Sequence, residues 1–495
     1  MTSPPKISRS PFPVAVALLA LAGLLLTGCL AGPSHTYENI RAERLAAETA
    51  APAPSPASQP APPHLAGPLT LDQALILALT QNPDQDAALA RIRQSEALLD
   101  QSLAAFLPQI SLYGEYTRAD APSVFLFKTI DQRNFQSNTD FNQPGRIQNF
   151  ETGVKVGWSL FRGGRDLLAR HMAATGVAMS REDRHILDNA LVASTIKAHF
   201  DCLAAADLTT IAQESVDTVS RQLQIMEVRY RAGGVLRSDV LSLEVRLAQA
   251  KEALVRADNA RRLCLAAMAN LLGGDVDADF TPQPAELPGL AVPDAYPAGV
   301  TLALAQRPEL LKVRQGVVRA RLGMDQARAE YLPTVGAQAS YYWDAPDLGF
   351  DAEKANWMAG LLVNWDIFTG LSTVNRQAET RAMLDEMLAA DRKATLGVQL
   401  DVKSMYLILR GAQARLEVTR ASVRQAAESL DLVKKEYEGG SANITRYLEA
   451  ELALNQARQS ASAARYDAQK ARADVARALG LWAAHAQQAR EAHEN

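Results

Sequence analysis

The sequence predicts a mainly α-helical protein that also carries four β-strands, and three observations support this fold class. Hydrophobic residues make up 48% of the 495 residues while aromatic residues make up 6%, so alanine and leucine supply most of the apolar surface. This bias is typical of long, closely packed helices. Two very long segments contain no proline, and several short segments alternate between apolar and polar residues, as half-buried strands do.

The composition argues against nucleic-acid binding, a disulfide scaffold and enzymatic chemistry. The net charge is −4, from 51 basic and 55 acidic side chains, so no excess of positive charge is available for a nucleic acid. Three cysteines are too few for a disulfide scaffold, and the chain has no His-Glu-x-x-His, Gly-x-Ser-x-Gly or Cys-x-x-Cys motif. His171, His185 and His199 share one helical stripe but lie about 21 Å apart, too far for one metal. We therefore expect no catalytic site, no metal and no cofactor.

The N-terminal residues predict export from the cytoplasm. Lys6 and Arg9 precede an uncharged run from Pro11 to Gly28, which is too short to span a bilayer comfortably and ends in small residues. We expect residues 1–28 to be a signal peptide. Leu26–Cys29 resembles a bacterial lipobox with Cys29 as the lipidated first residue of the mature chain, and Leu30 after it points to the outer membrane. The alternative is a soluble secreted protein with a chance cysteine.

An internal duplication organises the chain that follows. Leu107-Pro108 corresponds to Leu332-Pro333 at an offset of 225 residues, and Val156–Phe161 corresponds to Val363–Phe368 at an offset of 207. The offset falls by 18 residues, which indicates an insertion of that length in the first copy, between Pro108 and Trp158. The expected divisions are a lipidated N-terminus and Pro-rich spacer over 29–68, a first repeat over 69–280, a Pro-rich connector over 281–298, a second repeat over 299–483 and a polar tail over 484–495.

Each repeat is expected to begin with a helix and two strands. Leu71–Phe106 has a helical pattern that Pro108 ends. Phe150–Leu160 alternates between apolar and polar residues, and Trp357–Ile367 repeats this alternation. Weaker partner strands are expected at Ile110–Tyr116 and Val335–Trp343. The residues expected on the apolar strand face include Phe150, Val154, Val156, Trp158, Trp357, Leu361, Val363 and Trp365.

Each repeat then continues with a very long helix and a shorter one. No proline occurs from Gly164 to Ala232 or from Leu371 to Glu438, and about 68 residues at 1.5 Å each make a helix about 100 Å long. A pair of glycines, Gly233-Gly234 or Gly439-Gly440, then reverses the chain into a second helix of about 35 residues.

Two cysteines lie at similar distances on either side of the first glycine pair. An antiparallel hairpin would bring Cys202 and Cys264 to similar heights, and in an oxidising compartment they can form a disulfide. The alternative is two small core side chains that face apart, because the sequence does not set the helix phase and the Cα atoms of a disulfide lie within about 7 Å. Both interpretations stay open at this point.

The alternating strands imply a closed sheet if their apolar face meets the lipid of the outer membrane. Backbone groups in lipid must be hydrogen-bonded, which an open sheet edge does not allow. Bacterial barrels begin at about eight strands, so one chain cannot close a barrel with four, and three chains would supply twelve. The opposite strand face carries Glu151, Lys155, Asn364 and Asp366, which suit a water-filled lumen. The alternative is a soluble sheet beside a coiled coil.

These features together resemble the TolC-type outer-membrane efflux proteins, over roughly residues 69–483. The resemblance rests on the lipobox, the Pro-rich spacer, the duplicated pattern and the turn Tyr-x-x-Gly-x5-Asp-Val/Leu. The insertion resembles a subset of that family through Ser123–Phe127 and Asn138–Phe141. What the family implies is a homotrimer with a twelve-stranded barrel in outer-membrane lipid and an α-helical periplasmic tunnel, docked to a periplasmic adaptor protein and an inner-membrane transporter.

The implied function is the passive exit duct of a tripartite efflux system for small molecules, with no enzymatic activity. Two alternatives stay open. One is the exit duct of a type I protein secretion system, and the other is a coiled-coil structural lipoprotein without a pore. The alternating strands favour a pore, since a spacer has no use for them.

The resemblance also implies an iris-like gate at the far end of the long helices. By position, Asp239 and Tyr437 match members of the family's polar network, and Glu449 matches an acid at the aperture. Arg446 occupies a position where the best-known member has an acid, so the polar bridges that close that member's gate cannot be assigned to this chain. Our hypothesis is that Arg446 bridges to Asp239 or Glu449 and that three Glu449 side chains form an acidic ring. The alternative is an exposed pair that contributes at most about 1 kcal/mol. The turns expected to face the adaptor contain Gly233, Gly234, Gly439 and Gly440.

Overall fold

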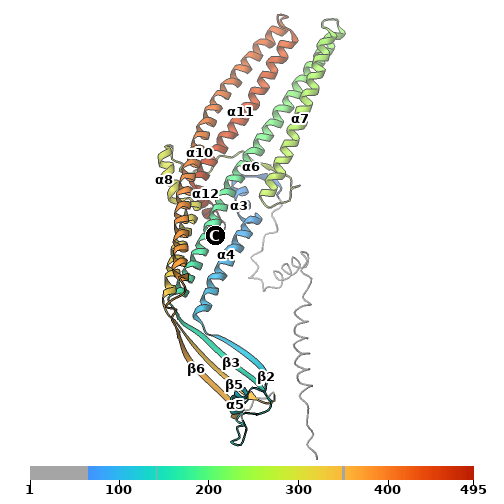
Figure 1. The fold of residues 1–495 in the computed structure, drawn as a ribbon. Coiled ribbons are helices and arrows are strands. Elements are labelled where there is room, and N and C mark those ends of the chain that lie inside the picture. The colour runs from blue at the N-terminus through green and yellow to red at the C-terminus, as the bar shows by residue number, and fades with distance from the viewer. Residues whose placement is uncertain (1–64, 141, 348–351, 495) are drawn as a thin grey trace, which may run out of the picture. The chain divides into compact units, whose positions relative to one another are not determined.

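Long antiparallel helices and one four-stranded sheet make up most of the protein, which we describe from a computed structural model (Figure 1). The structure describes residues 65–140, 142–347 and 352–494. The expected signal peptide, the lipidation site Cys29 and most of the Pro-rich spacer lie outside the described residues. The predicted fold class, mainly α-helical with four membrane-type strands in one sheet, is confirmed. Two further short strands, Gly67–Leu69 and Phe280–Pro282, which the sequence did not predict, pair in parallel as a second sheet.

The two halves of the chain contain corresponding elements in the same order. Those of the first half are β1 (Gly67–Leu69), α3 (Leu71–Gln81), α4 (Pro83–Gln101), η1 (Ser102–Phe106), β2 (Gln109–Ala119), α5 (Pro122–Asp131), β3 (Ile147–Arg162), α6 (Arg165–Arg231) and α7 (Arg237–Leu271). Those of the second half are β4 (Phe280–Pro282), α8 (Tyr296–Gln306), α9 (Pro308–Arg328), η2 (Ala329–Tyr331), β5 (Thr334–Ala345), η3 (Ala352–Lys354), β6 (Ala355–Asn364), α10 (Ser372–Glu438), α11 (Ile444–Leu479) and α12 (Leu481–Glu494). Among these, α5, η3 and α12 have no counterpart in the other half.

The two long helices, α6 and α10, each contain 67 residues and turn back into α7 and α11, as the sequence predicts. At each reversal one glycine takes a left-handed conformation, Gly233 with φ 73° and Gly440 with φ 79°. This conformation costs a side chain energy that glycine avoids. Figure 1 shows the two hairpins, α6 with α7 and α10 with α11, extending away from the strands.

The helical segment predicted over Leu71–Phe106 is not one helix, which corrects that expectation. It divides at Asn82, whose backbone is extended (ψ 127°), and α4 begins at Pro83. A residue before proline avoids the α conformation because it clashes with the proline ring, which explains the break. The second half divides in the same way at Arg307, before Pro308.

The sheet has the order β2-β3-β5-β6 and is antiparallel throughout. Residues 147–162 make β3 longer than the predicted Phe150–Leu160, while β6 ends at Asn364 and is shorter than the predicted Trp357–Ile367. Trp365 therefore lies beyond the strand, which corrects its assignment to the strand face.

The C-terminal segment expected to be a polar tail is instead the helix α12. Trp482 is buried and donates its Nε1 hydrogen to the Ala473 carbonyl at 2.9 Å, and Ala486 is also buried. Arg490 binds the buried carboxylate of Asp188 on α6 with a hydrogen bond of 2.9 Å from Nη1. A polar composition does not keep a segment in solvent when a tertiary partner pairs its charge, as Asp188 pairs Arg490.

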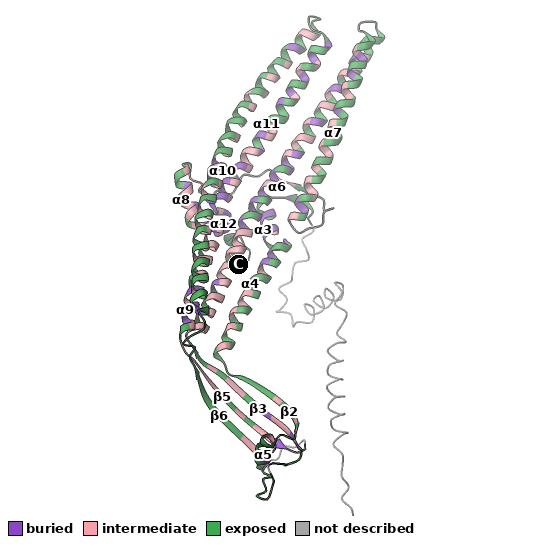
Figure 2. Ribbon diagram, in the orientation of Figure 1, coloured by how far each residue is buried: buried purple, intermediate pink, exposed green. Residues whose placement is uncertain are grey.

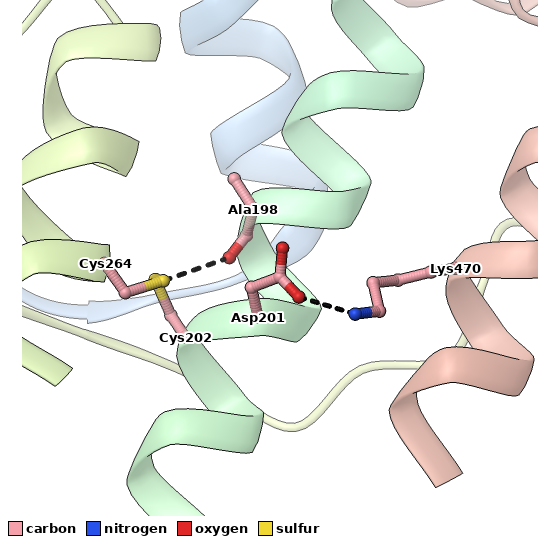
Figure 3. The surroundings of a disulfide bond; sticks show 5 residues. All are labelled: Ala198, Asp201, Cys202, Cys264 and Lys470. Atoms are coloured by element: carbon pink, nitrogen blue, oxygen red, sulfur yellow. Dashed lines mark hydrogen bonds and ion pairs between the residues drawn. A yellow bond between two sulfur atoms is a disulfide. The ribbon is translucent and has the colours of Figure 1, made fainter. Parts of the chain in front are cut away.

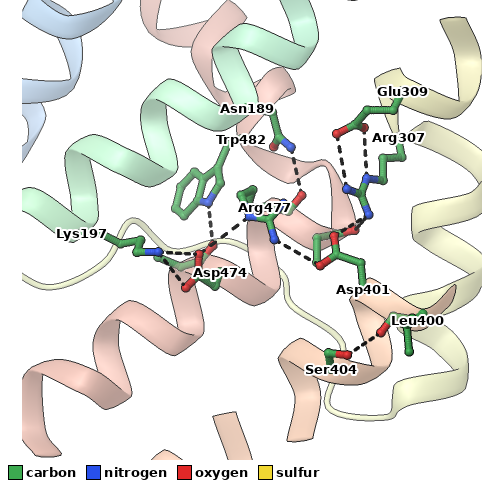
Figure 4. A network of polar contacts seen from close by, with 12 residues as sticks. Asn189, Lys197, Arg307, Glu309, Leu400, Asp401, Ser404, Asp474, Arg477 and Trp482 are labelled. Atoms are coloured by element: carbon green, nitrogen blue, oxygen red, sulfur yellow. Dashed lines mark hydrogen bonds and ion pairs between the residues drawn. The ribbon is translucent and has the colours of Figure 1, made fainter. Parts of the chain in front are cut away.

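The largest core cluster lies where α3 and α12 pack on the middle of α6, and buried residues concentrate there in Figure 2. Its largest side chains include Leu75, Ile196, Phe200, Met268, Leu272 and Trp482. Beside this core, Lys197 of α6 pairs with Asp474 of α11 at 3.3 Å and so joins the two halves (Figure 4). A second group of ion pairs lies within the second half. Asp401 of α10 binds Arg307 at 2.7 Å and Arg477 of α11 at 3.3 Å. Arg307 and Pro308 therefore fix the start of α9 against the C-terminal part of the second half.

Cys202 of α6 and Cys264 of α7 are joined by a disulfide bond, with their Cα atoms 5.4 Å apart (Figure 3). Beside it, Asp201 pairs with Lys470 of α11 at 2.7 Å. Of the two interpretations that the sequence left open, the structure adopts the bonded one, in which the disulfide links α6 to α7 near the main core.

We predict that the bond forms in the exported protein. Alkylation without reduction should leave Cys202 and Cys264 unlabelled, and peptide mass mapping checks this. Cys264→Ser should lower stability by about 2–4 kcal/mol, the usual effect of losing a structural disulfide, and should lower the melting temperature. Free thiols at both positions in the oxidised wild type would contradict the prediction.

His199 is a second buried group near this core. Its Nε2 lies 2.8 Å from the Gln283 carbonyl oxygen, and its Nδ1 has no hydrogen-bond partner among the described residues. Burial lowers the pKa of His199, and the hydrogen bond to Gln283 opposes that shift only in part.

We predict an acid-sensitive core as a result. The unfolded imidazole takes up its proton at a higher pH than the folded one, so stability falls as the pH drops below about 6.5. His199→Gln keeps a donor but does not titrate, so its melting temperature should fall less than that of the wild type between about pH 7.5 and 5.5. His171→Gln is the control, because His171 is exposed on the same helix. Equal losses in all three proteins would contradict the prediction.

Candidate functional site

One face of the sheet is apolar across all four strands. The register places Leu112, Val154 and Tyr341 directly opposite one another on β2, β3 and β5. Leu112 is 82% exposed and Leu361 is 73% exposed, so this face has no cover among the described residues. A continuous apolar face of this kind marks a surface that meets lipid or another protein. It contains Ile110, Leu112, Tyr116, Phe150, Val154, Val156, Trp158, Val335, Ala337, Ala339, Tyr341, Trp343, Trp357, Ala359, Leu361 and Val363.

Aromatic side chains gather at the two ends of this face and aliphatic ones between them. Trp158 lies near the helices, Tyr341 and Trp343 lie near the other end with ring centroids 5.0 Å apart, and Val156 and Ala339 form a middle row. Two aromatic girdles around an aliphatic band are typical of strands that span an outer membrane.

The opposite face of the sheet is mainly polar on β2, β3 and β5, while β6 places Met358 and Leu362 there. Ser111, Lys155 and Ser340 form one row, and the next rows carry Tyr113 and Glu151, whose side chains are hydrogen-bonded at 2.8 Å. The alternation predicted for β3 thus extends to strands whose own sequence signal is weak. The reason is that residues paired across neighbouring strands point to the same face of the sheet.

Two tryptophans join the sheet to the helices, a role that sequence reasoning missed. Trp158 Nε1 donates a hydrogen bond of 3.0 Å to the Phe106 carbonyl, and Trp365 Nε1 donates one of 3.0 Å to the Tyr331 carbonyl. Both acceptors are the last residues of short 3-10 helices. One of these helices, η1, precedes β2, and the other, η2, precedes β5. The sequence signal for this shared role is the 207-residue offset between Trp158 and Trp365, which places them at equivalent positions of the two repeats.

The helical tip contains a small core of its own. Met226 of α6, Leu243 of α7, Val433 of α10 and Tyr447 of α11 are buried in one cluster. The rings of Tyr437 and Tyr447 lie 5.6 Å apart, and Gln222 of α6 donates a hydrogen bond of 3.3 Å to the Tyr447 hydroxyl. The two hairpins therefore contact each other near their turns.

The predicted gate residues are only partly brought together. Tyr437 contacts α6 through Met226 Sδ, at 3.9 Å, and through the Arg229 guanidinium. Asp239 instead accepts the Leu236 backbone N–H at 3.2 Å, as a cap of α7. Within the described chain, Arg446 does not bridge to Asp239 or Glu449, and a bridge between chains stays a prediction. Arg446 pairs with Glu436 of α10 at 3.4 Å, because the turn brings the end of α10 beside the start of α11.

Glu451 is a buried acid between the hairpins that sequence reasoning did not single out. Its Oε1 accepts a hydrogen bond of 3.1 Å from Asn455 and lies 3.5 Å from Ser215 Oγ of α6, while Oε2 has no hydrogen-bond partner among the described residues. Burial raises the pKa of Glu451, although nearby Arg246 and these hydrogen bonds oppose the shift.

Two kinds of feature are absent from the described residues. No helix there is both long and apolar enough to cross a membrane. No group of three or more histidine, cysteine, aspartate or glutamate side chains is arranged to hold a metal ion in that part of the chain.

Known proteins share this architecture. Residues 74–274 and 299–481 match the family described as outer membrane efflux protein. The pyoverdine export outer membrane protein OpmQ of Pseudomonas aeruginosa is 23% identical over 413 residues, 83% of this chain and 85% of OpmQ. The alkaline protease secretion protein AprF of the same species is 25% identical over 402 residues, 79% of this chain and 80% of AprF. The Campylobacter jejuni CmeC outer membrane channel has a TM-score of 0.72 at 17% identity, covering 83% of this chain and 85% of CmeC.

We predict that Glu451 weakens the contact between the hairpins at neutral pH. Because its folded pKa is raised, the unfolded carboxyl loses its proton first, and stability falls as the pH rises above about 4.3. Glu451→Gln should therefore stabilise the protein by about 1 kcal/mol at neutral pH and change little near pH 4, as melting curves at both values would show. Glu449→Gln, on an exposed side chain of the same helix, is the control. A destabilised Glu451→Gln at neutral pH would contradict the prediction.

Proposed function

Because the chain belongs to the outer membrane efflux protein family, we propose that it is the outer membrane channel of a tripartite efflux system and the passive exit duct for small molecules. It is an outer membrane protein that extends into the periplasm, and it is a channel protein rather than an enzyme. The duct would be a homotrimer that docks onto a periplasmic adaptor and receives its cargo from an inner-membrane transporter.

The exposed apolar sheet face carries the proposal. In hydrocarbon, each backbone N–H and C=O needs a partner, so a sheet that meets lipid must close on itself. Among the described residues, the edge strands β2 and β6 each pair with one neighbour, so four strands leave this sheet open. Three chains with their edges paired would form a barrel of twelve strands, within the range of known outer-membrane barrels. The polar face would then line the lumen.

The remaining parts of the duct follow from this arrangement. The helical hairpins would continue the lumen into the periplasm, and their turns at Gly233-Gly234 and Gly439-Gly440 would meet the adaptor. Asp239, Tyr437, Arg446 and Glu449 would surround the periplasmic gate, with Glu449 free in this geometry to contribute to an acidic ring. Acyl chains on Cys29 would anchor the protein in the membrane in addition to the barrel, since several acyl chains bind a bilayer more tightly than one.

A second candidate function is the exit duct of a protein secretion system. Its support is the likeness to AprF, which is named for protease secretion, whereas OpmQ is named for pyoverdine export. The lipobox resemblance favours the small-molecule duct. Deleting the gene separates the two candidates, because loss of a duct for small molecules raises susceptibility to toxic compounds, whereas loss of a secretion duct removes proteins from the culture medium.

We predict that the purified protein forms trimers and conducts ions across a planar lipid bilayer. Ala339→Arg places a charge in the middle row of the apolar face and should cost about 2–4 kcal/mol per chain, so membrane insertion should fail. Gln338→Arg is the matched control, because the neighbouring residue points to the polar face. Insertion assays in outer membrane fractions distinguish them. Equal insertion of both variants, or a wild type without conductance, would contradict the proposed function.

A further inference from the structure

The helix α5 lies on the polar face of the sheet, at the end far from the long helices (Figure 1). It belongs to the insertion that only the first half contains. The ammonium group of Lys128 contacts Glu151 Oε2 at 2.5 Å and Asp344 Oδ1 at 3.0 Å. Because β3 and β5 point these two carboxylates to the polar face, α5 covers the side of the sheet that would line the lumen.

The sheet provides a physical reason for this contact. Glu115, Glu151 and Asp344 stand directly opposite one another on β2, β3 and β5, so three carboxylates form one row. Like charges in directly opposed positions destabilise a sheet. Asp344 is fully buried, and a buried charge without a partner is more costly still. The cation of Lys128 offsets both costs, so the acidic row holds α5 in place.

Further hydrogen bonds attach the C-terminal end of the same helix. Gln132 donates to the Asn149 side chain at 2.8 Å and to the Gln148 carbonyl at 2.9 Å. Asn356 of β6 donates to the Asp131 carbonyl at 3.3 Å. Through Lys128, Asp131 and its C-cap residue Gln132, the helix is thus tied to strands from both halves of the chain.

The opposite side of α5 is apolar. Phe127 is 64% exposed and Ile130 is 41% exposed, and residues three apart share one side of a helix. Lys128 and Gln132, four apart, form the side that contacts the sheet. In a closed trimer, the polar strand face looks toward the axis, so Phe127 and Ile130 of each chain would point toward their copies in the other two chains.

We propose that the three α5 helices form an apolar constriction at the distal exit of the duct, with Lys128 as the residue that positions each helix and Phe127 and Ile130 as its lining. This inference rests on the proposed trimeric duct. Apolar constrictions hinder ions because water leaves a narrow apolar passage. A constriction held by ion pairs at this end would also favour small solutes over polypeptides.

Single-channel conductance of the full-length protein in planar bilayers tests the inference. Phe127→Ser combined with Ile130→Ser makes the lining polar and should raise conductance about twofold or more, since wetting removes the barrier. Lys128→Met should also raise it, by releasing the helix, while Lys128→Arg should keep the wild-type value because it retains the cation.

Lys155→Met is the charge control, because it removes the same charge from the same sheet face without contacting α5. An equal rise in Lys155→Met and Lys128→Met would assign the effect to lumen charge and overturn the inference. Wild-type conductance in both the Phe127/Ile130 double variant and Lys128→Met would overturn it as well. If Lys128→Met fails to fold, the double variant decides, since its two side chains are exposed. A wild type that forms no pores would instead overturn the proposed duct itself.

Discussion

A sheet with one apolar face must keep that face out of water and must also pair the backbone groups along its edges. In this protein the apolar face extends across β2, β3, β5 and β6, and both outer strands have a neighbour on one side only. Burying the face against the chain's own helices is excluded by their placement, because the helices continue from one end of the strands (Figure 1). Lipid and further copies of the chain satisfy both needs together.

The same requirement explains the contacts at the two ends of the strands. At the helical end, the indoles of Trp158 and Trp365 bind carbonyls of the segments that enter the sheet. These bonds fix the angle between sheet and helices at equivalent places in the two halves. At the far end, the polar face carries the acidic row, and Lys128 of the insertion neutralises it. The insertion thus completes a charge pattern that the strands alone leave unbalanced.

Duplication produced two halves with similar backbones and different constraints. The first hairpin is closed by the disulfide between Cys202 and Cys264. In the second hairpin, neither equivalent position is a cysteine. Its polar contacts to the first hairpin include those of Tyr447 with Gln222 and of Asn455 with Ser215. Nearer the core, ion pairs of Arg490 of α12 with Asp188 and of Asp474 of α11 with Lys197 hold the halves together.

The periodic features of the fold follow from the sequence alone. Proline-free runs predict the two long helices, glycine pairs predict their turns, and alternation predicts β3 and β6 though not their exact ends, because each depends on local backbone chemistry and side-chain period. Pro83 also indicates a break in the helix, since proline disfavours the helical conformation in the residue before it. The apolar pattern on both sides of Pro83 nevertheless predicts one helix. Family resemblance added the trimeric duct and the positions of Asp239, Tyr437, Arg446 and Glu449.

Only the tertiary structure decided which side chains meet. It paired Arg446 with Glu436, buried Glu451, bonded Cys202 to Cys264, converted the expected tail into α12 and placed α5 on the polar face. None of these follows from periodicity, because each depends on the rotation of one element against another that is distant in the chain. The side-chain positions of a helix repeat every 3.6 residues whatever lies beside it. A contact also requires that each of two elements is rotated so that the contacting side chains face each other, and packing sets this rotation.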